Sequence, residues 1–136
     1  MDELKFKSDG TSVVARMADC RISTPDGRHV LELPYDGEPP HGDSYHRLLV
    51  DGRVFPGRAW GCNFALSDRS LHVAFSWMPA MLQRKTVVLS LGDYSYCILP
   101  SYIHDFSFSW PALVGVGHLS RNQGFVFTGE ESWQRF

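Results

Sequence analysis

Short runs of β-branched and aromatic residues, separated by turn-forming residues, constrain the fold of this chain more than any other feature. The clearest run is Ile103–Trp110, in which aromatic residues alternate with serines. This period of two is typical of a strand, because successive side chains point to opposite faces. Turn signals such as Thr24-Pro25-Asp26-Gly27 and Asp51-Gly52 stand between the runs, and Asp-Gly is a strong hairpin dipeptide.

About ten short strands with turns at this spacing predict an antiparallel β sandwich or a barrel-like meander of hairpins. The 136 residues fit one domain, so we expect a single all-β domain over residues 1–136 with little helix. A short helix or 3₁₀ turn is expected at Pro79–Arg84, and a tail or short helix at Glu130–Phe136. The expected strands are Ser12–Met17, Cys20–Ser23, Arg28–Leu33, Tyr45–Val50, Ala59–Leu66, Leu71–Trp77, Lys85–Leu91, Tyr94–Leu99, Ile103–Trp110 and Gly124–Thr128.

Composition excludes several classes of protein. Hydrophobic residues make up 43% of the chain and aromatics 13%, which is enough to build a core and excludes global disorder. The net charge of −2 does not fit a basic nucleic-acid binder, so no direct nucleic-acid partner is expected. No run approaches the roughly 20 apolar residues of a membrane helix, and residues 1–7 lack a signal-type apolar core. We therefore expect a cytoplasmic protein without a membrane partner.

Motifs that carry chemistry are absent from the sequence. It contains no Gly-x-Ser-x-Gly elbow and no phosphate-binding Walker loop. The three cysteines, Cys20, Cys62 and Cys97, are odd in number and far apart, so neither a disulfide scaffold nor a zinc site is indicated. We expect no enzyme activity, no cofactor and no metal ion, and we expect the cysteines to be small buried hydrophobes.

One segment stands out by its charge and stiffness. Residues 34–44 contain three prolines and two glycines, so they are expected to form a long loop outside any central strand. Between residues 36 and 51 four acids and one arginine give a formal charge of −3. Carboxylates can steer encounter with a basic protein surface, tyrosines can anchor it, and a stiff loop loses little entropy on binding. The predicted partner-binding residues are Tyr35, Asp36, Glu38, Asp43, Tyr45 and Asp51.

The chain resembles bacterial immunity proteins, which neutralise secreted toxins of effector–immunity pairs such as those of type VI secretion. The resemblance lies in small size, the acidic loop and the absence of catalytic motifs. It is carried by the run from Thr24 to His46, by Trp60-Gly61-Cys62 and by Phe75-Ser76-Trp77-Met78-Pro79. It implies an inhibitor that occludes the active site of a cognate toxin. A nuclease toxin would suit the acidic loop, because such enzymes carry basic substrate grooves.

Two alternatives remain open at this point. A small β enzyme or metal-binding module could use His41, Asp43 and His46, although their spacing matches no common metal motif. A structural module could instead self-associate through a strand edge. The sequence does not determine the oligomeric state.

Overall fold

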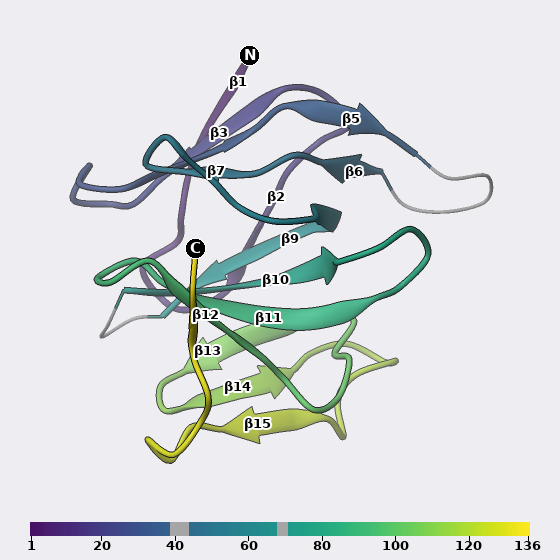
Figure 1. Cartoon of the computed structure of the whole chain (residues 1–136). Coiled ribbons are helices and arrows are strands. Elements are labelled where there is room, and N and C mark those ends of the chain that lie inside the picture. Colours follow the sequence, from purple (N-terminus) through teal and green to yellow (C-terminus); the bar gives the residue numbers. More distant parts are fainter. Residues whose placement is uncertain (39–43, 68–70) are drawn as a thin grey trace.

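The structure is a computed structural model that describes residues 1–38, 44–67 and 71–136 (Figure 1). These residues form strands and turns and contain no helix, which confirms the all-β prediction. The described strands are β1 (Asp2–Lys5), β2 (Ser12–Val14), β3 (Cys20–Ser23), β4 (Val30–Leu33), β5 (Tyr35–Gly37), β6 (Tyr45–His46), β7 (Leu49–Val50), β8 (Arg53–Val54), β9 (Arg58–Leu66), β10 (His72–Met78), β11 (Lys85–Ser90), β12 (Ser95–Ile98), β13 (Phe106–Ser109), β14 (Ala112–Gly115), β15 (Gly124–Val126) and β16 (Gln134–Arg135).

The strands form three sheets. Sheet A has the order β1-β3-β4-β7-β8, sheet B has the order β16-β12-β11-β10-β9-β6-β5 with β2 also paired to β9, and sheet C has the order β13-β14-β15. Every pairing is antiparallel except that of β1 with β3. Each strand order has two ends and none closes among the described residues, so the sandwich prediction is confirmed and the barrel-like one is not.

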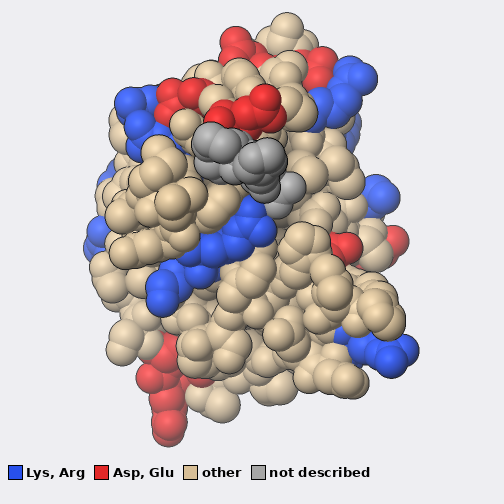
Figure 2. Space-filling view, turned by 90° about the vertical axis from the view of Figure 1, so that its right-hand side faces the viewer, with Lys and Arg blue, Asp and Glu red and all other residues tan. Residues whose placement is uncertain are grey.

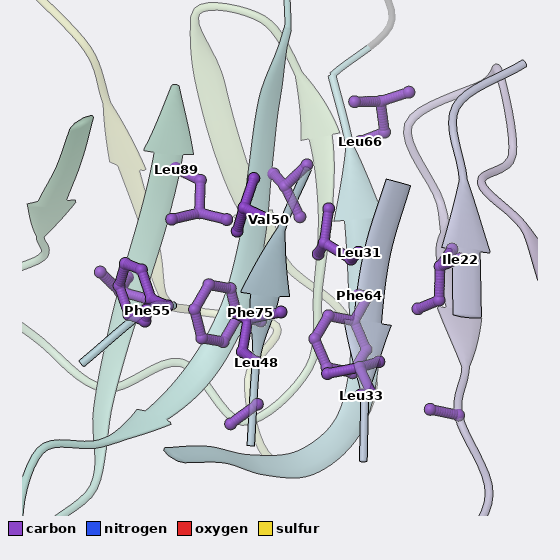
Figure 3. Packing of buried hydrophobic residues seen from close by; sticks show 14 of the residues in the cluster. Ile22, Leu31, Leu33, Leu48, Val50, Phe55, Phe64, Leu66, Phe75 and Leu89 are labelled. Atoms are coloured by element: carbon purple, nitrogen blue, oxygen red, sulfur yellow. The ribbon is translucent and has the colours of Figure 1, made fainter. Parts of the chain in front are cut away.

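The sheets lie in layers, with the long strands of sheet B between sheets A and C (Figure 1). One core fills the space between sheets A and B, and Leu31, Val50, Phe64 and Phe75 meet there (Figure 3). A second core lies between sheets B and C. Because both faces of the central strands are covered, β10 is buried from Val73 onward rather than in alternation.

Side-chain size differs between the two faces of the central sheet. The face toward sheet A carries large side chains such as Phe64 and Phe75. The face toward sheet C carries smaller ones, namely Ala65, Ala74, Val88 and Cys97, which pack with Phe106, Phe108, Leu113 and Phe127. The small residues of sheet B face the large residues of sheet C, which lets sheets B and C pack together at the density of a protein interior.

Several local expectations are corrected by the structure. Tyr35–Gly37 forms a strand within the expected loop, which Pro34 permits because β5 is an edge strand. The expected strand Tyr45–Val50 splits into β6 in sheet B and β7 in sheet A, so the chain crosses between layers there. Residues 79–84 form bends and a turn rather than a helix, and β1, β8, β14 and β16 were not predicted.

No helix in the described part of the chain is long and apolar enough to cross a bilayer.

Candidate functional site

Strands β5 and β6 form a short hairpin at one end of sheet B (Figure 1). Tyr35 pairs with His46 and Gly37 pairs with Tyr45. The backbone N–H of Tyr35 donates to Oδ1 of Asp19 at 2.8 Å, which attaches the hairpin to the segment before β3. On the other side β6 pairs with β9. The hairpin is therefore fixed at its base, while Pro39, Pro40, His41, Gly42 and Asp43 lie outside the described residues.

Of the predicted partner-binding residues, Tyr35 and Tyr45 lie on the two strands of this hairpin and Glu38 directly follows β5. Tyr35 is 37% exposed and its ring meets that of His46 edge to face at 5.7 Å between centroids. Tyr45 is half-buried, and its hydroxyl lies 3.1 Å from the position that a side-chain carbon on Gly37 would take. Gly37 has φ +143°, a conformation that favours glycine, and any larger residue there would also force the Tyr45 hydroxyl to shift.

The negative charge of Asp36 is offset by two arginines. Its Oδ2 accepts a hydrogen bond from Nε of Arg58 on β9, and its Oδ1 lies 3.9 Å from Nε of Arg47. Sequence counting included Arg47 but not Arg58, which is far along the chain and meets the hairpin only because β6 pairs with β9. Asp36 thus leaves less uncompensated negative charge on the hairpin than the sequence analysis assumes.

Asp51 belongs to an internal network and not to the hairpin. It occupies the β7–β8 turn with φ 50°, next to Gly52 with φ 81°, as the Asp-Gly dipeptide predicts. Its carboxylate accepts hydrogen bonds from Nδ1 of His29 at 2.5 Å, from the N–H of Val30 at 2.8 Å and from the hydroxyl of Tyr94 at 2.9 Å. Its side chain is only 17% exposed, so we assign Asp51 to fold stability.

The Asp51 pKa reflects this network. Burial raises the pKa, but the hydrogen bonds from His29, Val30 and Tyr94 together outweigh burial and hold the pKa below its ordinary value. The carboxylate is therefore ionised at neutral pH, where it is the acceptor for all three donors.

A surface depression lies beside the hairpin. It has a volume of about 510 Å³, and Glu38, Val14, Met17 and Arg16 are among the residues that line it. Val14 is 55% and Met17 57% exposed, and Glu38 is exposed as well. The two apolar residues come from β2 and the loop after it, and the sequence analysis missed them because alternation alone does not show which strand face stays uncovered.

Charges of both signs lie on the side of the molecule to which the hairpin points (Figure 2). Acidic side chains gather toward the top of this view, and basic side chains cross its middle. Charges of both signs on this side, and exposed apolar residues in the depression beside the hairpin, are a composition that suits the rim and core of a protein interface.

The proposed metal ligands are only partly described. His46 is completely buried, and its Nε2–H donates to the carbonyl oxygen of Ala18 at 3.0 Å. Its Nδ1 has no hydrogen-bond partner among the described residues. A metal bound through Nε2 would have to displace the Ala18 bond, while His41 and Asp43 lie outside the described residues. Elsewhere in the described ranges, no cluster of three or more His, Cys, Asp or Glu side chains could hold a metal ion.

Two of the cysteines are deep in the two cores. Cys20 and Cys97 are buried, and burial is the main cause that raises the pKa of each thiol. Cys62 is half-buried and packs against the core between sheets A and B. Thiols with raised pKa values are poor nucleophiles at neutral pH. Cys20 and Cys97 are buried hydrophobes as the sequence predicts, whereas Cys62 is only half-buried and departs from that prediction.

Comparison with known proteins finds no matching family model, no matching curated protein and no matching solved structure.

Proposed function

We propose that this chain is an immunity protein that binds a cognate secreted bacterial toxin and occludes its active site. The observation that carries the proposal is the exposed face at the β5–β6 hairpin, where Glu38 borders a depression with exposed apolar residues. Apolar groups can supply most of the contact energy there, and the carboxylate can guide the approach of a basic partner.

The hairpin suits binding because its base is fixed. The Tyr35–Asp19 hydrogen bond and the pairing of β6 with β9 hold the strands in place before a partner arrives. A surface that is ordered in advance loses little conformational entropy on association. Tyr35 offers a rigid aromatic contact of the kind enriched at interface hot spots.

A nuclease is the toxin class that this face suits best. Nucleases bind a polyanion and therefore carry basic grooves, which the exposed carboxylate of Glu38 at the edge of the depression can approach. Because Asp36 is already paired with Arg58, we assign the steering charge mainly to Glu38 and assign Asp36 to holding the hairpin against β9.

Co-expression with a candidate toxin encoded beside its gene tests the proposal. Bacteria that produce the toxin should grow only when this chain is also produced, and the purified pair should form a complex measurable by calorimetry. Val14→Asp places a charge in the depression and should weaken the complex by at least about tenfold, because it buries an unpaired carboxylate. Val126→Asp is the matched control, since Val126 is 60% exposed on β15, outside the depression.

Glu38→Lys tests the electrostatic part separately. It should slow association and reduce its salt dependence, whereas Glu130→Lys makes the same charge change at another exposed site. Absence of growth protection and of a complex would refute the immunity function. Equal effects of the depression variant and its control would refute this face as the binding surface.

A further inference from the structure

A second pocket lies where sheets B and C meet the C-terminal segment, away from the β5–β6 hairpin. It has a volume of about 440 Å³, which falls in the range of ligand pockets. Its walls come from the start of β10, the β11–β12 turn, the β13–β14 turn and the chain after β15. The residues that define its chemistry are His72, Asp93, Trp110, Phe127, Glu131 and Trp133.

The aromatic side chains of this pocket form a stack of nearly parallel rings. Trp110 lies 4.2 Å from His72 and 5.1 Å from Phe127 between ring centroids, at interplanar angles of 14° and 19°. Phe127 in turn lies 5.9 Å from Trp133 at 26°. The neighbouring rings cover the faces of Trp110 and Phe127, so a face remains only at the ends of the stack. A free ring face carries negative charge density and attracts cations, with indole the strongest of the protein rings.

Two carboxylates complete the pocket. Asp93 accepts a hydrogen bond from the Ser95 hydroxyl at 2.7 Å, and this bond, together with one from Ser90, holds the Asp93 pKa below its ordinary value. Glu131 accepts from the N–H and hydroxyl of Thr128, each at 2.9 Å, and these bonds lower the pKa of Glu131. Both side chains are therefore anionic at neutral pH.

The pocket contributes little positive charge of its own. Burial lowers the pKa of His72, which keeps its imidazole neutral at pH 7. Among the described residues that line the pocket, none is lysine or arginine. Arg135 lies near enough to Asp93 to act on its pKa, but it does not line the pocket.

We propose that this pocket binds a guanidinium group, which lies against the outer face of Trp133, the half-buried indole at the end of the stack, and donates hydrogen bonds to Asp93 and Glu131. A planar cation fits because it can stack on a ring while its edge N–H groups reach carboxylates. The group can come from an arginine side chain of a bound protein or from a free small molecule. The inference goes beyond the proposed function and does not depend on it.

Titration of the full chain with N-acetyl-arginine amide, followed by two-dimensional NMR of the tryptophan indole groups, tests the proposal. The indole signals of Trp110 and Trp133 should shift, with binding that weakens as salt is added. The control ligand is N-acetyl-citrulline amide, which has the same shape without the charge and should not bind. Equal binding of both ligands, or no shift at either indole, would overturn the proposal.

Variants locate the charge that recognises the ligand. Asp93→Asn should weaken binding of the arginine probe by about twofold to fivefold, the range for a partly exposed ion pair. Asp26→Asn is a matched control, because Asp26 also accepts a hydroxyl bond, from Thr24 at 2.6 Å, but lies in another turn. Equal affinities of the two variants would contradict the assignment. The same NMR spectra report whether each variant is folded.

A peptide with an internal arginine distinguishes the two sources of the group. Tighter binding of the peptide than of the arginine amide supports a protein side chain as the natural occupant. Tighter or equal binding of the amide supports a free small molecule. A methyl glycoside that displaces the arginine probe would instead identify a sugar site and overturn the cation proposal.

Discussion

Replacement of Asp51 by alanine should destabilise the fold more than any other single loss of a carboxylate described above. The side chain is 17% exposed and accepts three hydrogen bonds of 2.5–2.9 Å that join β4, the β7–β8 turn and the turn before β12. Hydrogen bonds to a charged group contribute about 1.5–3 kcal/mol each when they do not share a partner. Because these three hydrogen bonds share one carboxylate, we expect their removal to cost about 3 kcal/mol of stability. This is well below the sum of three separate hydrogen-bond contributions.

The backbone adds a second contribution. Asp51 has φ 50°, a left-handed conformation that aspartate and asparagine tolerate better than alanine, with a cost of about 1 kcal/mol. Asp51→Asn therefore serves as the matched control, since asparagine keeps the turn conformation and can still accept hydrogen bonds. We expect Asp51→Ala to lower the free energy of unfolding by about 4 kcal/mol in all, and Asp51→Asn to lower it by about half as much.

Urea unfolding followed by tryptophan fluorescence measures both variants. With a slope of about 2 kcal/mol per molar urea, the midpoint of Asp51→Ala should fall by about 2 M. A loss below about 0.5 kcal/mol for Asp51→Ala would refute the assignment of Asp51 to stability. It would leave this carboxylate available for the partner-binding role that the sequence analysis predicts.

The pH dependence gives an independent check on the same residue. Because the folded-state pKa of Asp51 is lowered, its stabilisation is complete above the unfolded pKa of about 3.9 and is lost as the pH falls through the folded pKa. Asparagine at residue 51 does not titrate. The difference in free energy of unfolding between Asp51→Asn and the parent chain should therefore shrink below about pH 4. A difference that stays constant down to about pH 2 would contradict the lowered pKa.

Three further predictions test the layers. Phe75→Ala should cost about 3–5 kcal/mol in the same urea assay, because Phe75 is fully buried and meets Phe64 at 5.7 Å between ring centroids. Val88→Phe should cost about 1–3 kcal/mol, since Val88 is fully buried against sheet C and the larger ring overfills that core. Gly115→Ala should be strongly destabilising, because its new side-chain carbon would lie 1.8 Å from the Ser120 carbonyl oxygen. Gly92→Ala is the control, because a side-chain carbon there would meet nothing beyond its chain neighbours within 4 Å. Similar melting temperatures for these two variants would argue against the packing described.

The paired state of Asp36 changes how a toxin complex would form. A carboxylate already bound to Arg58 must lose that bond before it can contact a partner, and exchange of one exposed ion pair for another yields little net energy. Apolar contacts at Val14 and Met17 therefore supply the larger share of the binding energy in the proposed interface. We expect the affinity to depend moderately on salt concentration. This dependence should be weaker than that of an interface with four unpaired acids.

Local features of the sequence were sufficient for much of the secondary structure. The Asp51-Gly52 turn, the strands around Phe75 and Val88 and the burial of Cys20 follow from residue type and short-range pattern. Of the short helix or 3₁₀ turn expected at residues 79–84, only a single turn formed, in which the N–H of Gln83 donates to the carbonyl oxygen of Ala80 at 3.0 Å. The strand Asp2–Lys5 was missed because its charged residues lack strand character, although it pairs with β3 at the edge of sheet A.

The sequence by itself determined that this chain folds into strands joined by tight turns, since those preferences act between neighbouring residues. Only the tertiary structure decided which carboxylates are engaged in bonds within the fold. Arg58 meets Asp36 through the pairing of β6 with β9, and His29 and Tyr94 meet Asp51 where layers and turns converge. These contacts join residues more than twenty positions apart, and a period of two shows that a strand has two faces without showing what covers either one.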